Sequence, residues 1–496
     1  MTRYSHLITD SNRKWWTLGA MCFALFMIML DNTVVNVALP SIQRDLDSSL
    51  SGLQWTINGY TLSFAVLLAT GGRLGDIFGR RRMFLAGVTL FAVSSVTAGL
   101  AAGTTTLVLS RVVQGVGASL MMPATLSIVT HAFPPAERGK AIGTWAGISA
   151  LALAIGPVLG GFLTEHVSWR AIFYLNVPVA IGAVLATVFA VRESRDETVG
   201  RSVDYLGVGV ATAGLTALVL GLIEANSWGW TSPEIIALFA GAVVLLGLFV
   251  VVEQRVPAPM VEFPLFAGRN FVGANLVALI VTFAMLGQFF FLALYMQDIL
   301  GLSPLEAGVR FLPATLMIIA VAPLAGRLTD RIGARWPIAV GLTLVSGAMY
   351  WLTTIDPGTT YADIWPSFTL MGLGMALVMS PMSTAAMNAV ATAKAGIASG
   401  ILSMSRMVGG TLGVAVLGAI FQSQVGTDAL SAGASAASRD AFIDAFTTAM
   451  WVATVVVLSG LVIAVSLITS HRREAASTAE AVAEAAPMGE LAAVEH

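Results

Sequence analysis

The sequence predicts an all-helical integral membrane protein with fourteen transmembrane segments. The first observation is composition, because 56% of the residues are hydrophobic and only 11% are charged, whereas soluble globular proteins carry roughly 25% charged residues. The second is a series of apolar runs that approach the roughly 20 residues needed to cross a bilayer. The third is that polar or glycine- and proline-rich breaks separate these runs.

The apolar runs define the expected spans in chain order. The first is continuous over 15–39, which is longer than the core of about 7 to 15 residues in a secretory signal peptide, so we expect a retained helix. The other runs have similar length and boundaries. The expected spans are 15–39, 53–71, 83–103, 105–129, 141–163, 171–191, 204–223, 234–252, 271–296, 305–325, 337–355, 366–388, 397–421 and 446–469.

Lysine and arginine collect on one side of the expected bundle. With the N-terminus inside, 20 of the 26 basic residues fall in cytoplasmic segments, and only Arg44, Arg170, Arg310 and Arg439 fall outside. The positive-inside rule favours this orientation. Because the number of spans is even, we expect both termini in the cytoplasm and the protein in the plasma (inner) membrane.

A ten-residue segment after the second span is echoed after the tenth. Residues 72–81 read GRLGDIFGRR and residues 326–335 read GRLTDRIGAR. Internal repeats of this kind mark secondary transporters, and a separation of eight spans instead of six indicates that two helices are inserted between the repeats. The expected organisation is a cytoplasmic N-terminus (1–14), a six-helix bundle (15–191), two inserted helices (204–252), a second six-helix bundle (271–469) and a disordered cytoplasmic tail (472–496).

Asp31 is the residue around which we interpret the chain, because it is an acid inside the first span. Insertion scales assign roughly 2.5 to 3.5 kcal/mol to such a group at mid-depth, and intramembrane acids therefore face a protein interior or a wet cavity and handle ions or protons. The alternative is a structural aspartate that is hydrogen-bonded to a neighbouring helix.

Several motifs together resemble the major facilitator superfamily, and the fourteen spans resemble its EmrB/QacA-like branch of drug:proton antiporters. Besides the repeated segment, these motifs are Leu107-x-x-x-Arg111-x-x-Gln114-Gly115-x-Gly117, Ala152-x-x-x-Gly156-Pro157-x-x-Gly160-Gly161 and Trp169-Arg170-x-x-Phe173-x-x-Asn176-Val177-Pro178. The resemblance implies two pseudo-symmetric six-helix bundles that alternate access to a site between them. We interpret the last motif as structural.

The resemblance implies a conformational latch in the turn Gly72-x-Leu74-x-Asp76-x-x-Gly79-Arg80-Arg81. Asp76, with Gly79 and Arg80, would hold the cytoplasmic side closed against the start of span 13, near 394–398, while the site opens outward. The alternative is that the arginines only anchor the topology.

Arg111 is expected at the same depth as Asp31. At about 1.5 Å per residue, both residues fall in the outer halves of their helices. A neighbouring arginine favours a charged carboxylate and burial disfavours it, so movement of Arg111 would switch the proton affinity of Asp31. The hypothesis is that Asp31 carries the proton and Arg111 modulates it; the alternative is a structural arginine that donates to carbonyls of span 1.

Span 5 has small residues every fourth position, at Ala152, Gly156 and Gly160, which gives one flat face for close packing. Pro157 removes a backbone hydrogen bond and kinks the helix. These residues suggest a hinge that does not leak protons, and packing alone is the alternative. Ala152 departs from the family pattern, which has glycine there.

Polar residues inside other spans are candidates to bind the substrate. Asn32 and Asn36, and likewise Gln54 and Asn58, lie one turn apart on one helix face. Arg406 lies near the middle of span 13, where it would bind an anionic group, pair with a counter-charge or stabilise carbonyls. Glu224 is either a second acid or an exposed interfacial residue. The candidates are Asn32, Asn36, Gln54, Asn58, Tyr60, Gln288, Asn388 and Arg406.

Several other functions are excluded or disfavoured. None of the three lysines lies in a Gly-x-x-x-x-Gly-Lys-Ser/Thr loop, so ATP is not bound by that route. The single cysteine and the scattered histidines predict neither a metal site nor a catalytic cluster. The basic residues follow topology and form no nucleic-acid-binding stripe. We expect no cofactor, no enzyme activity and no nucleic-acid partner.

The leading hypothesis is a multidrug efflux transporter that exchanges protons for hydrophobic, often cationic compounds by alternating access. One charge crossing the membrane is worth about 2.3 kcal/mol per 100 mV, so one protonated carboxylate can drive accumulation. The alternative is a dedicated proton-coupled exporter of one endogenous metabolite, antibiotic, siderophore or lipid. We expect a monomer whose partners are the substrate, protons and the lipid bilayer.

Overall fold

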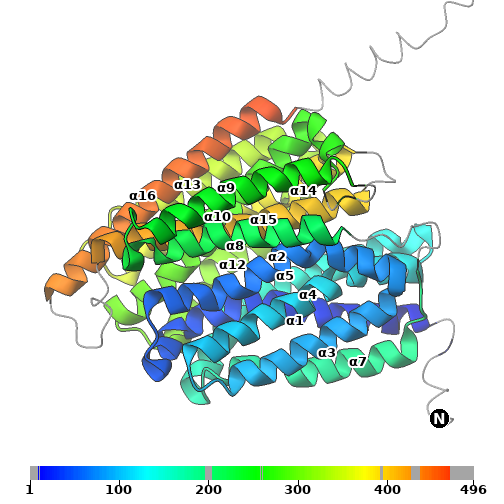
Figure 1. The fold of residues 1–496 in the computed structure, drawn as a ribbon, viewed down its shortest axis with the longest axis horizontal. Coiled ribbons are helices and arrows are strands. Elements are labelled where there is room, and N and C mark those ends of the chain that lie inside the picture. The colour runs from blue at the N-terminus through cyan, green and yellow to red at the C-terminus, as the bar shows by residue number, and fades with distance from the viewer. Residues whose placement is uncertain are drawn as a thin grey trace, which may run out of the picture.

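A computed structural model describes residues 9, 12–195, 204–256, 259, 261–390, 395–425 and 436–469. The expected tail 472–496 lies outside the described residues. Within the described part, every regular element is a helix (Figure 1), and each of the fourteen expected spans coincides with a helix or a pair of consecutive helices.

The first half contains α1 to α7. Ser49 begins α2 because its side chain accepts a hydrogen bond from Gly52 N at 3.2 Å, and Gly79 ends that helix with a φ of 107°, which glycine adopts without strain. The helices are α1 (Arg13–Leu46), α2 (Leu50–Phe78), α3 (Arg80–Gly99), α4 (Thr104–Ala132), α5 (Pro135–His166), α6 (Ala171–Tyr174) and α7 (Asn176–Ala190).

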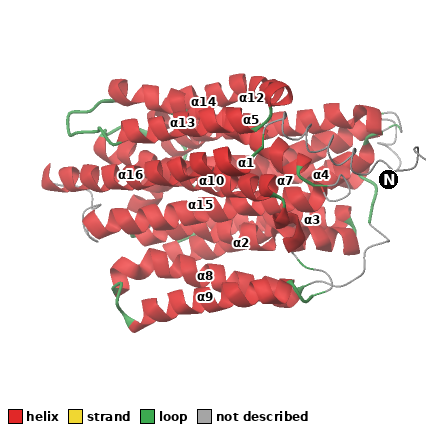
Figure 2. Cartoon of the chain, turned by 90° about the horizontal axis from the view of Figure 1, so that it is seen from above, coloured by secondary structure: helices red, strands yellow, loops and turns green. Residues whose placement is uncertain are grey.

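Two further helices, α8 (Tyr205–Trp228) and α9 (Pro233–Glu253), pack against each other at the edge of the bundle (Figure 2). Asp204 and Ser232 begin them, each accepting a backbone N–H three residues ahead. α8 contacts both α2 of the first half and α15 of the second half. The inserted pair therefore lies along the seam between the halves.

The second half repeats the pattern of the first, with short helical breaks. α13 has 18 residues and corresponds to the expected span 337–355. The elements are η1 (Phe263–Ala267), α10 (Arg269–Leu294), η2 (Tyr295–Ile299), α11 (Pro304–Arg310), α12 (Leu312–Ile332), α13 (Arg335–Leu352), α14 (Tyr361–Asn388), α15 (Ala395–Val425) and α16 (Ala436–Leu467).

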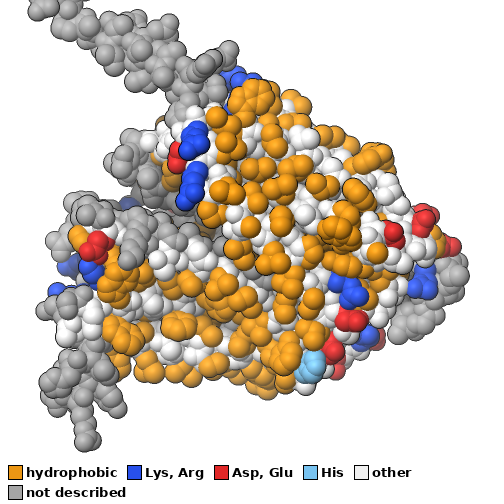
Figure 3. All heavy atoms as spheres, turned by 180° about the vertical axis from the view of Figure 1, so that it is seen from behind, with side chains coloured by type: hydrophobic (Ala, Val, Ile, Leu, Met, Phe, Trp, Pro, Cys, Tyr) orange, Lys and Arg blue, Asp and Glu red, His pale blue; other side chains and the backbone are white. Residues whose placement is uncertain are grey.

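By length and composition, the described residues form 12 helices that can cross a membrane, or 13 if the two parts of α5 count as one span. The exposed surface agrees with this, because hydrophobic side chains cover the middle of the molecule and charged ones gather at its two ends (Figure 3). Val243, Val462 and Leu109 are among the large apolar side chains that are exposed. The protein is therefore a multi-pass membrane protein.

Glycine contacts show the internal repeat in three dimensions. Gly87 of α3 crosses Gly117 of α4 so closely that an added Cβ would lie 2.7 Å from the facing carbonyl oxygen, and Gly341 of α13 meets Gly374 of α14 at the same distance. Gly79 and Gly333 both have positive φ, at 107° and 80°. These equivalent positions indicate that the two halves share one packing scheme.

The end of the bundle that carries Arg80, Arg81, Arg82 and Arg335 is called the basic end here. The polar contacts between the halves lie at mid-depth or toward the opposite end. Among the described residues they join Thr411 to Thr61 (2.8 Å), Gln54 to the Val414 carbonyl (3.4 Å), Gln297 to the Val37 carbonyl (2.7 Å) and Leu305 N to Glu165 (2.9 Å). These polar contacts of the described residues therefore lie away from the basic end.

Candidate functional site

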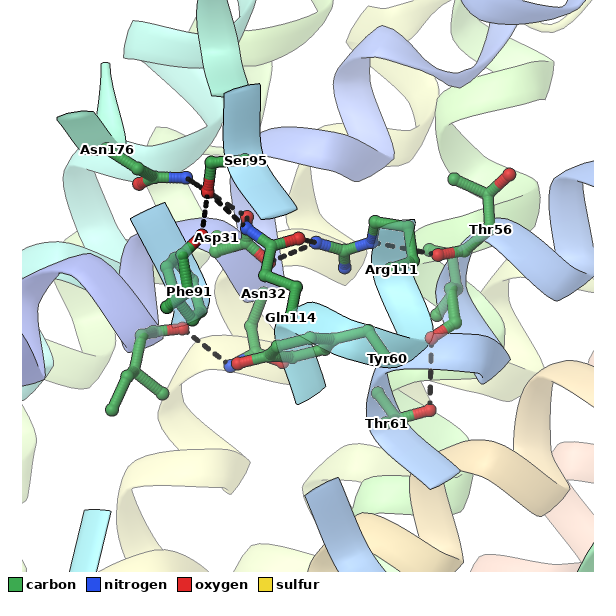
Figure 4. Close-up of polar contacts among 12 residues, drawn as sticks. Asp31, Asn32, Thr56, Tyr60, Thr61, Phe91, Ser95, Arg111, Gln114 and Asn176 are labelled. Atoms are coloured by element: carbon green, nitrogen blue, oxygen red, sulfur yellow. Dashed lines mark hydrogen bonds and ion pairs between the residues drawn. The ribbon is translucent and has the colours of Figure 1, made fainter. Parts of the chain in front are cut away.

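Asp31 of α1 and Arg111 of α4 form an ion pair inside the first half (Figure 4). Arg111 Nη1 donates to Asp31 Oδ2. Asp31 is 1% exposed and Arg111 is 2% exposed. The sequence prediction that these two residues lie at matching depth is consistent with this contact, and the pair is removed from bulk water.

Three side chains that the sequence analysis did not assign to this site complete it. Gln114 donates to Asp31 Oδ1 at 3.1 Å and to Ser95 at 2.9 Å. Asn176 of α7 donates to Asp31 Oδ1 at 3.5 Å and to Ser95 at 3.3 Å. Both Asp31 oxygens therefore accept hydrogen bonds from neighbouring helices.

Arg111 is also held from its other side. Its Nε donates to the Thr56 carbonyl of α2 at 3.0 Å, and its Nη1 donates to Gln114 at 2.6 Å. The Tyr60 ring lies 4.4 Å from the guanidinium carbon and the Phe173 ring lies 5.8 Å from it. Tyr60, a candidate substrate-binding residue, is fully buried against Arg111 in this structure.

At the basic end, Asp76 and Arg80 pair with each other. Arg80 Nη2 and Nε donate to Asp76 Oδ1 at 2.8 and 3.0 Å, and Arg80 Nη1 contacts the His131 ring at 2.9 Å. These contacts stay within the first half. The expected counterpart of the latch, near 394–398, lies partly outside the described residues.

Glu193, which the sequence analysis did not single out, holds the turn between α2 and α3. Its carboxylate accepts Arg81 N at 3.0 Å and Arg82 N at 3.2 Å, and so caps the N-terminus of α3. A Cβ at Gly79 would lie 2.6 Å from this carboxylate. Glycine is therefore favoured at position 79 by its φ, and a side chain there would also displace the Glu193 carboxylate.

The small residues of α5 contact two different helices. Gly156 approaches Thr33 of α1, and a Cβ at Gly160 would lie 2.6 Å from Val34. Gly161 packs against the backbone of Pro304, at the start of α11 in the second half. One face of α5 therefore holds α1 and the adjacent face meets the second half.

α5 is bent by 40° between its parts Gly147–Leu153 and Ile155–His166. Pro157 lies one turn beyond Leu153 and cannot donate a hydrogen bond to its carbonyl, which accounts for a bend at this point. The proposed hinge residues thus lie beside a real bend.

The remaining candidates are spread over the molecule. Asn58 and Gln288 are buried, and the amide atoms of Asn58 and the Oε1 of Gln288 have no hydrogen-bond partner among the described residues. Asn32 and Asn36 donate to carbonyls of their own helix, Ile28 and Asn32, at 2.9 and 3.0 Å.

The structure also places three further polar residues that the sequence analysis singled out. Asn388 is exposed and lines a small cavity of about 40 Å³ at the basic end. Glu224 is half-buried on α8 and contacts Trp55 and Ser51 of α2. Arg406 is half-buried on α15 and donates to Ser383 of α14. The structure therefore does not gather all candidates into one pocket.

Comparisons with known proteins agree on one family. The model of the Major Facilitator Superfamily matches residues 21–414. The chain is 37% identical to the tetracenomycin C resistance and export protein of Streptomyces glaucescens, over 84% of this chain and 77% of that protein. It is 38% identical to the puromycin resistance protein of Streptomyces alboniger, over 95% and 94%.

Two further comparisons extend this result. The chain is 38% identical to the multidrug resistance protein Stp of Mycobacterium tuberculosis H37Rv, over 82% of this chain and 75% of that protein. Among solved structures, a bacterial homologue of the human lysosomal transporter Spinster, in an inward-facing and unoccupied conformation, superimposes with a TM-score of 0.64 at 17% identity, covering 91% of this chain and 96% of the other. That similarity concerns the fold alone.

Proposed function

Since the chain belongs to the Major Facilitator Superfamily, it is a membrane transporter and not an enzyme, and we propose that it is a proton-coupled antiporter for multiple drugs. Its substrates are hydrophobic, often cationic, compounds. The relatives named for antibiotic and multidrug resistance support a drug exporter. Within the superfamily we assign it to the fourteen-helix EmrB/QacA-like branch.

The observation that carries the proposal is the buried Asp31–Arg111 pair. Buried charges are stable only while they are paired, so a proton that neutralises Asp31 leaves Arg111 without its counter-charge. The guanidinium must then find another acceptor, such as the neighbouring Thr56 carbonyl or Gln114, which it already contacts. Proton binding at Asp31 thereby changes how α1 and α4 are held together.

Alternating access follows from moving the halves, 15–191 and 271–469, against each other. The positive-inside rule places the basic end in the cytoplasm, so contacts at the opposite end close the site to the outside. We assign the present arrangement to the inward-facing state, in which Asp76 pairs with Arg80. In the outward-facing state Asp76, with Gly79 and Arg80, forms the latch to the start of α15, and α5 bends at Gly156, Pro157 and Gly160.

The cycle needs no cofactor other than the proton gradient, and one chain suffices. Outside, Asp31 takes up a proton as the substrate leaves; inside, it releases the proton as the substrate binds. Among the described residues, the buried amide of Asn58 and the Oε1 of Gln288 have no hydrogen-bond partner. They support a polar part of the substrate site, because unpaired buried amide atoms need an acceptor, a donor or water.

A dedicated exporter of one compound is the second candidate. Several relatives are named for a single antibiotic, including tetracenomycin C and puromycin. Expression in a susceptible host and growth against a panel of unrelated toxic compounds separate the two. Resistance confined to one scaffold would support the dedicated exporter.

The test of proton coupling is uptake of ethidium into inside-out vesicles with and without a proton gradient. The Asp31→Asn variant is expected to lose gradient-dependent uptake, because its side chain takes up no proton in this pH range. Asp47→Asn is the matched control, since Asp47 is exposed just after α1 with a φ of 47° that asparagine also tolerates. Equal gradient-driven uptake in Asp31→Asn and wild type would overturn the proposal.

A further inference from the structure

Arg406 is the second arginine inside a span, and its environment differs from that of Arg111. Its Nη2 donates to Ser383 Oγ of α14 at 2.9 Å. Its Nε is buried and has no hydrogen-bond partner among the described residues. The side chain is therefore held at one point and keeps an unused donor.

No carboxylate of the described residues lies within ion-pair distance of Arg406. By contrast, Arg111 has Asp31 as its counter-ion. An unpaired guanidinium in a low-dielectric environment is costly, and charges at such positions mark substrate or ion pathways. The lack of a counter-ion among the described residues therefore suggests that Arg406 binds a ligand with a negative charge.

Arg406 lies close to the contact between the two halves. The next residue on α15, Met407, packs against the hydrophobic core of the first half, and Thr411, one turn further on, contacts Thr61. Arg406 thus lies beside the seam. Since helical side chains lean toward the N-terminus of their helix, its guanidinium points toward the basic end, away from the contact of Thr411 with Thr61.

Arg406 also connects α15 to α14, two helices whose main packing partners are other helices. α15 packs chiefly on α10, and α14 packs chiefly on α12 and α13. The Thr282 hydroxyl of α10 donates to the Arg406 carbonyl at 2.8 Å, which fixes the backbone from which the side chain extends. The backbone of Arg406 is therefore held in place by α10, and its guanidinium extends toward Ser383 of α14.

We propose that Arg406 and Ser383 form a subsite for a carboxylate group of the exported compound. The Nε edge of a guanidinium binds a carboxylate through two parallel hydrogen bonds, and the Ser383 hydroxyl holds that edge in place. This inference rests on the proposed export function and adds hydrophobic acids to its substrate range.

Binding of 1-pyrenebutyric acid and of its uncharged amide, 1-pyrenebutyramide, tests the subsite. The two probes differ only in the carboxylate. The full-length protein in nanodiscs is titrated at pH 7, with energy transfer from tryptophan to pyrene as the signal and empty nanodiscs as the blank. We expect wild type to bind the acid about tenfold more tightly than the amide, as for one hydrogen bond to a charged group.

Arg406→Gln is expected to abolish this preference and Ser383→Ala to reduce it by about threefold, since the serine only holds the guanidinium. Arg310→Gln is the matched control, because Arg310 lies at the opposite end, against the Tyr361 ring, and it should keep the full preference. Ser383→Ala also covers the case in which Arg406→Gln does not fold.

Three outcomes overturn the subsite: equal binding of acid and amide by wild type, an acid preference that survives in a folded Arg406→Gln, or the full wild-type preference in Ser383→Ala. These outcomes leave the ethidium result untouched. Conversely, an Arg406-dependent acid preference without gradient-driven ethidium uptake would contradict the proposed proton coupling and leave the subsite standing.

Discussion

At the scale of single residues, the Asp31–Arg111 pair connects charge to helix packing. The pair and its hydrogen-bond partners come from α1, α2, α4 and α7, and Ser95 of α3 holds two of these partners, Gln114 and Asn176. A change in the charge of Asp31 is therefore felt by most helices of that half at once. In the proposed mechanism, a single proton on Asp31 biases the position of the first half in this way.

The pair predicts a pattern of stability. Asp31→Leu leaves Arg111 charged and buried without a partner, which costs about 3–5 kcal/mol, whereas replacing both charges by apolar residues is often nearly neutral. We therefore expect Asp31→Leu to lower Tm markedly and Asp31→Leu with Arg111→Leu to recover most of the loss. Thermal unfolding of the purified variants measures this. A double variant no more stable than Asp31→Leu would contradict the ion-pair account.

Gly79 gives a second residue-scale prediction. An alanine there meets the Glu193 carboxylate at 2.6 Å in a backbone of φ 107°, so Gly79→Ala should destabilise the protein by about 1–3 kcal/mol. Gly147→Ala, at a helical position with open space around it, is the control and should raise stability by up to about 1 kcal/mol. Equal effects on Tm would count against this role of Gly79.

Part of the site could be predicted from single residues. Asp31 and Arg111 stand out as charges within apolar runs, and the rise per residue places them at similar depth. The sequence did not assign Ser95, Gln114 and Asn176 to this site. A single polar side chain in a span can form its hydrogen bonds with many different partners, including carbonyls of its own helix. Only the packing of α3, α4 and α7 around Asp31 shows that Gln114 and Asn176 both donate to it while Ser95 accepts from both amides.

At the scale of elements, α5 joins the halves at the end away from the basic end. Its Glu165 carboxylate accepts Leu305 N at 2.9 Å, so a side chain from one half caps α11 of the other. Gly161 packs on Pro304, and Gly308 packs on Pro157. The cap and the glycine contacts together close this end.

We expect Glu165→Ala to open this end in part, because it removes a hydrogen bond to a charged group at a site exposed to solvent, worth about 1 kcal/mol there. Spin labels at Val167→Cys and Val309→Cys, which are exposed positions on the two sides of the contact, report the separation by pulsed electron resonance. Cys22, the chain's single cysteine, is buried.

Glu234→Ala is the control for this experiment, since Glu234 starts α9 at the same end and away from the seam. It should leave the distance distribution unchanged. If Glu165→Ala also leaves the distribution unchanged, the cap does not contribute to closure.

The helices themselves were largely predictable, and their neighbours were not. Each apolar run became a helix, and Pro157 marked the bend in α5. Hydropathy identifies spans without specifying contacts, so the position of α8 between α2 and α15 had no signal in the sequence. Spans 171–191 and 305–325 each appear as two consecutive helices, with breaks near Leu175 and Phe311.

At the scale of the whole molecule, the repeat and the distribution of basic residues both indicate that the two halves have the same orientation in the membrane. Gly79 and Gly333 end equivalent helices, and both turns carry arginines at the basic end. The two halves therefore have the same orientation in the membrane. A pair of inserted helices preserves that relation, because an even number of crossings separates them.

This relation predicts the outcome of reporter fusions. Green fluorescent protein fused after His496 should fluoresce, because it folds in the cytoplasm, whereas fusion after Trp228, between α8 and α9, should give no fluorescence in a Sec-exporting bacterial host. Whole-cell fluorescence normalised to expression measures this. Fluorescence from the Trp228 fusion would reverse or break the expected topology.

The contact of Gly161 with Pro304 and of Gly308 with Pro157 has a kinetic consequence. Neither glycine carries a side chain that must change rotamer when the two halves separate at these contacts. We therefore expect this separation to have a low kinetic barrier. Within each half, the close helix crossings of Gly87 with Gly117 and of Gly341 with Gly374 favour movement of the half as a rigid body. In the proposed cycle we therefore expect protonation of Asp31, and not separation of the two halves, to limit the rate of turnover.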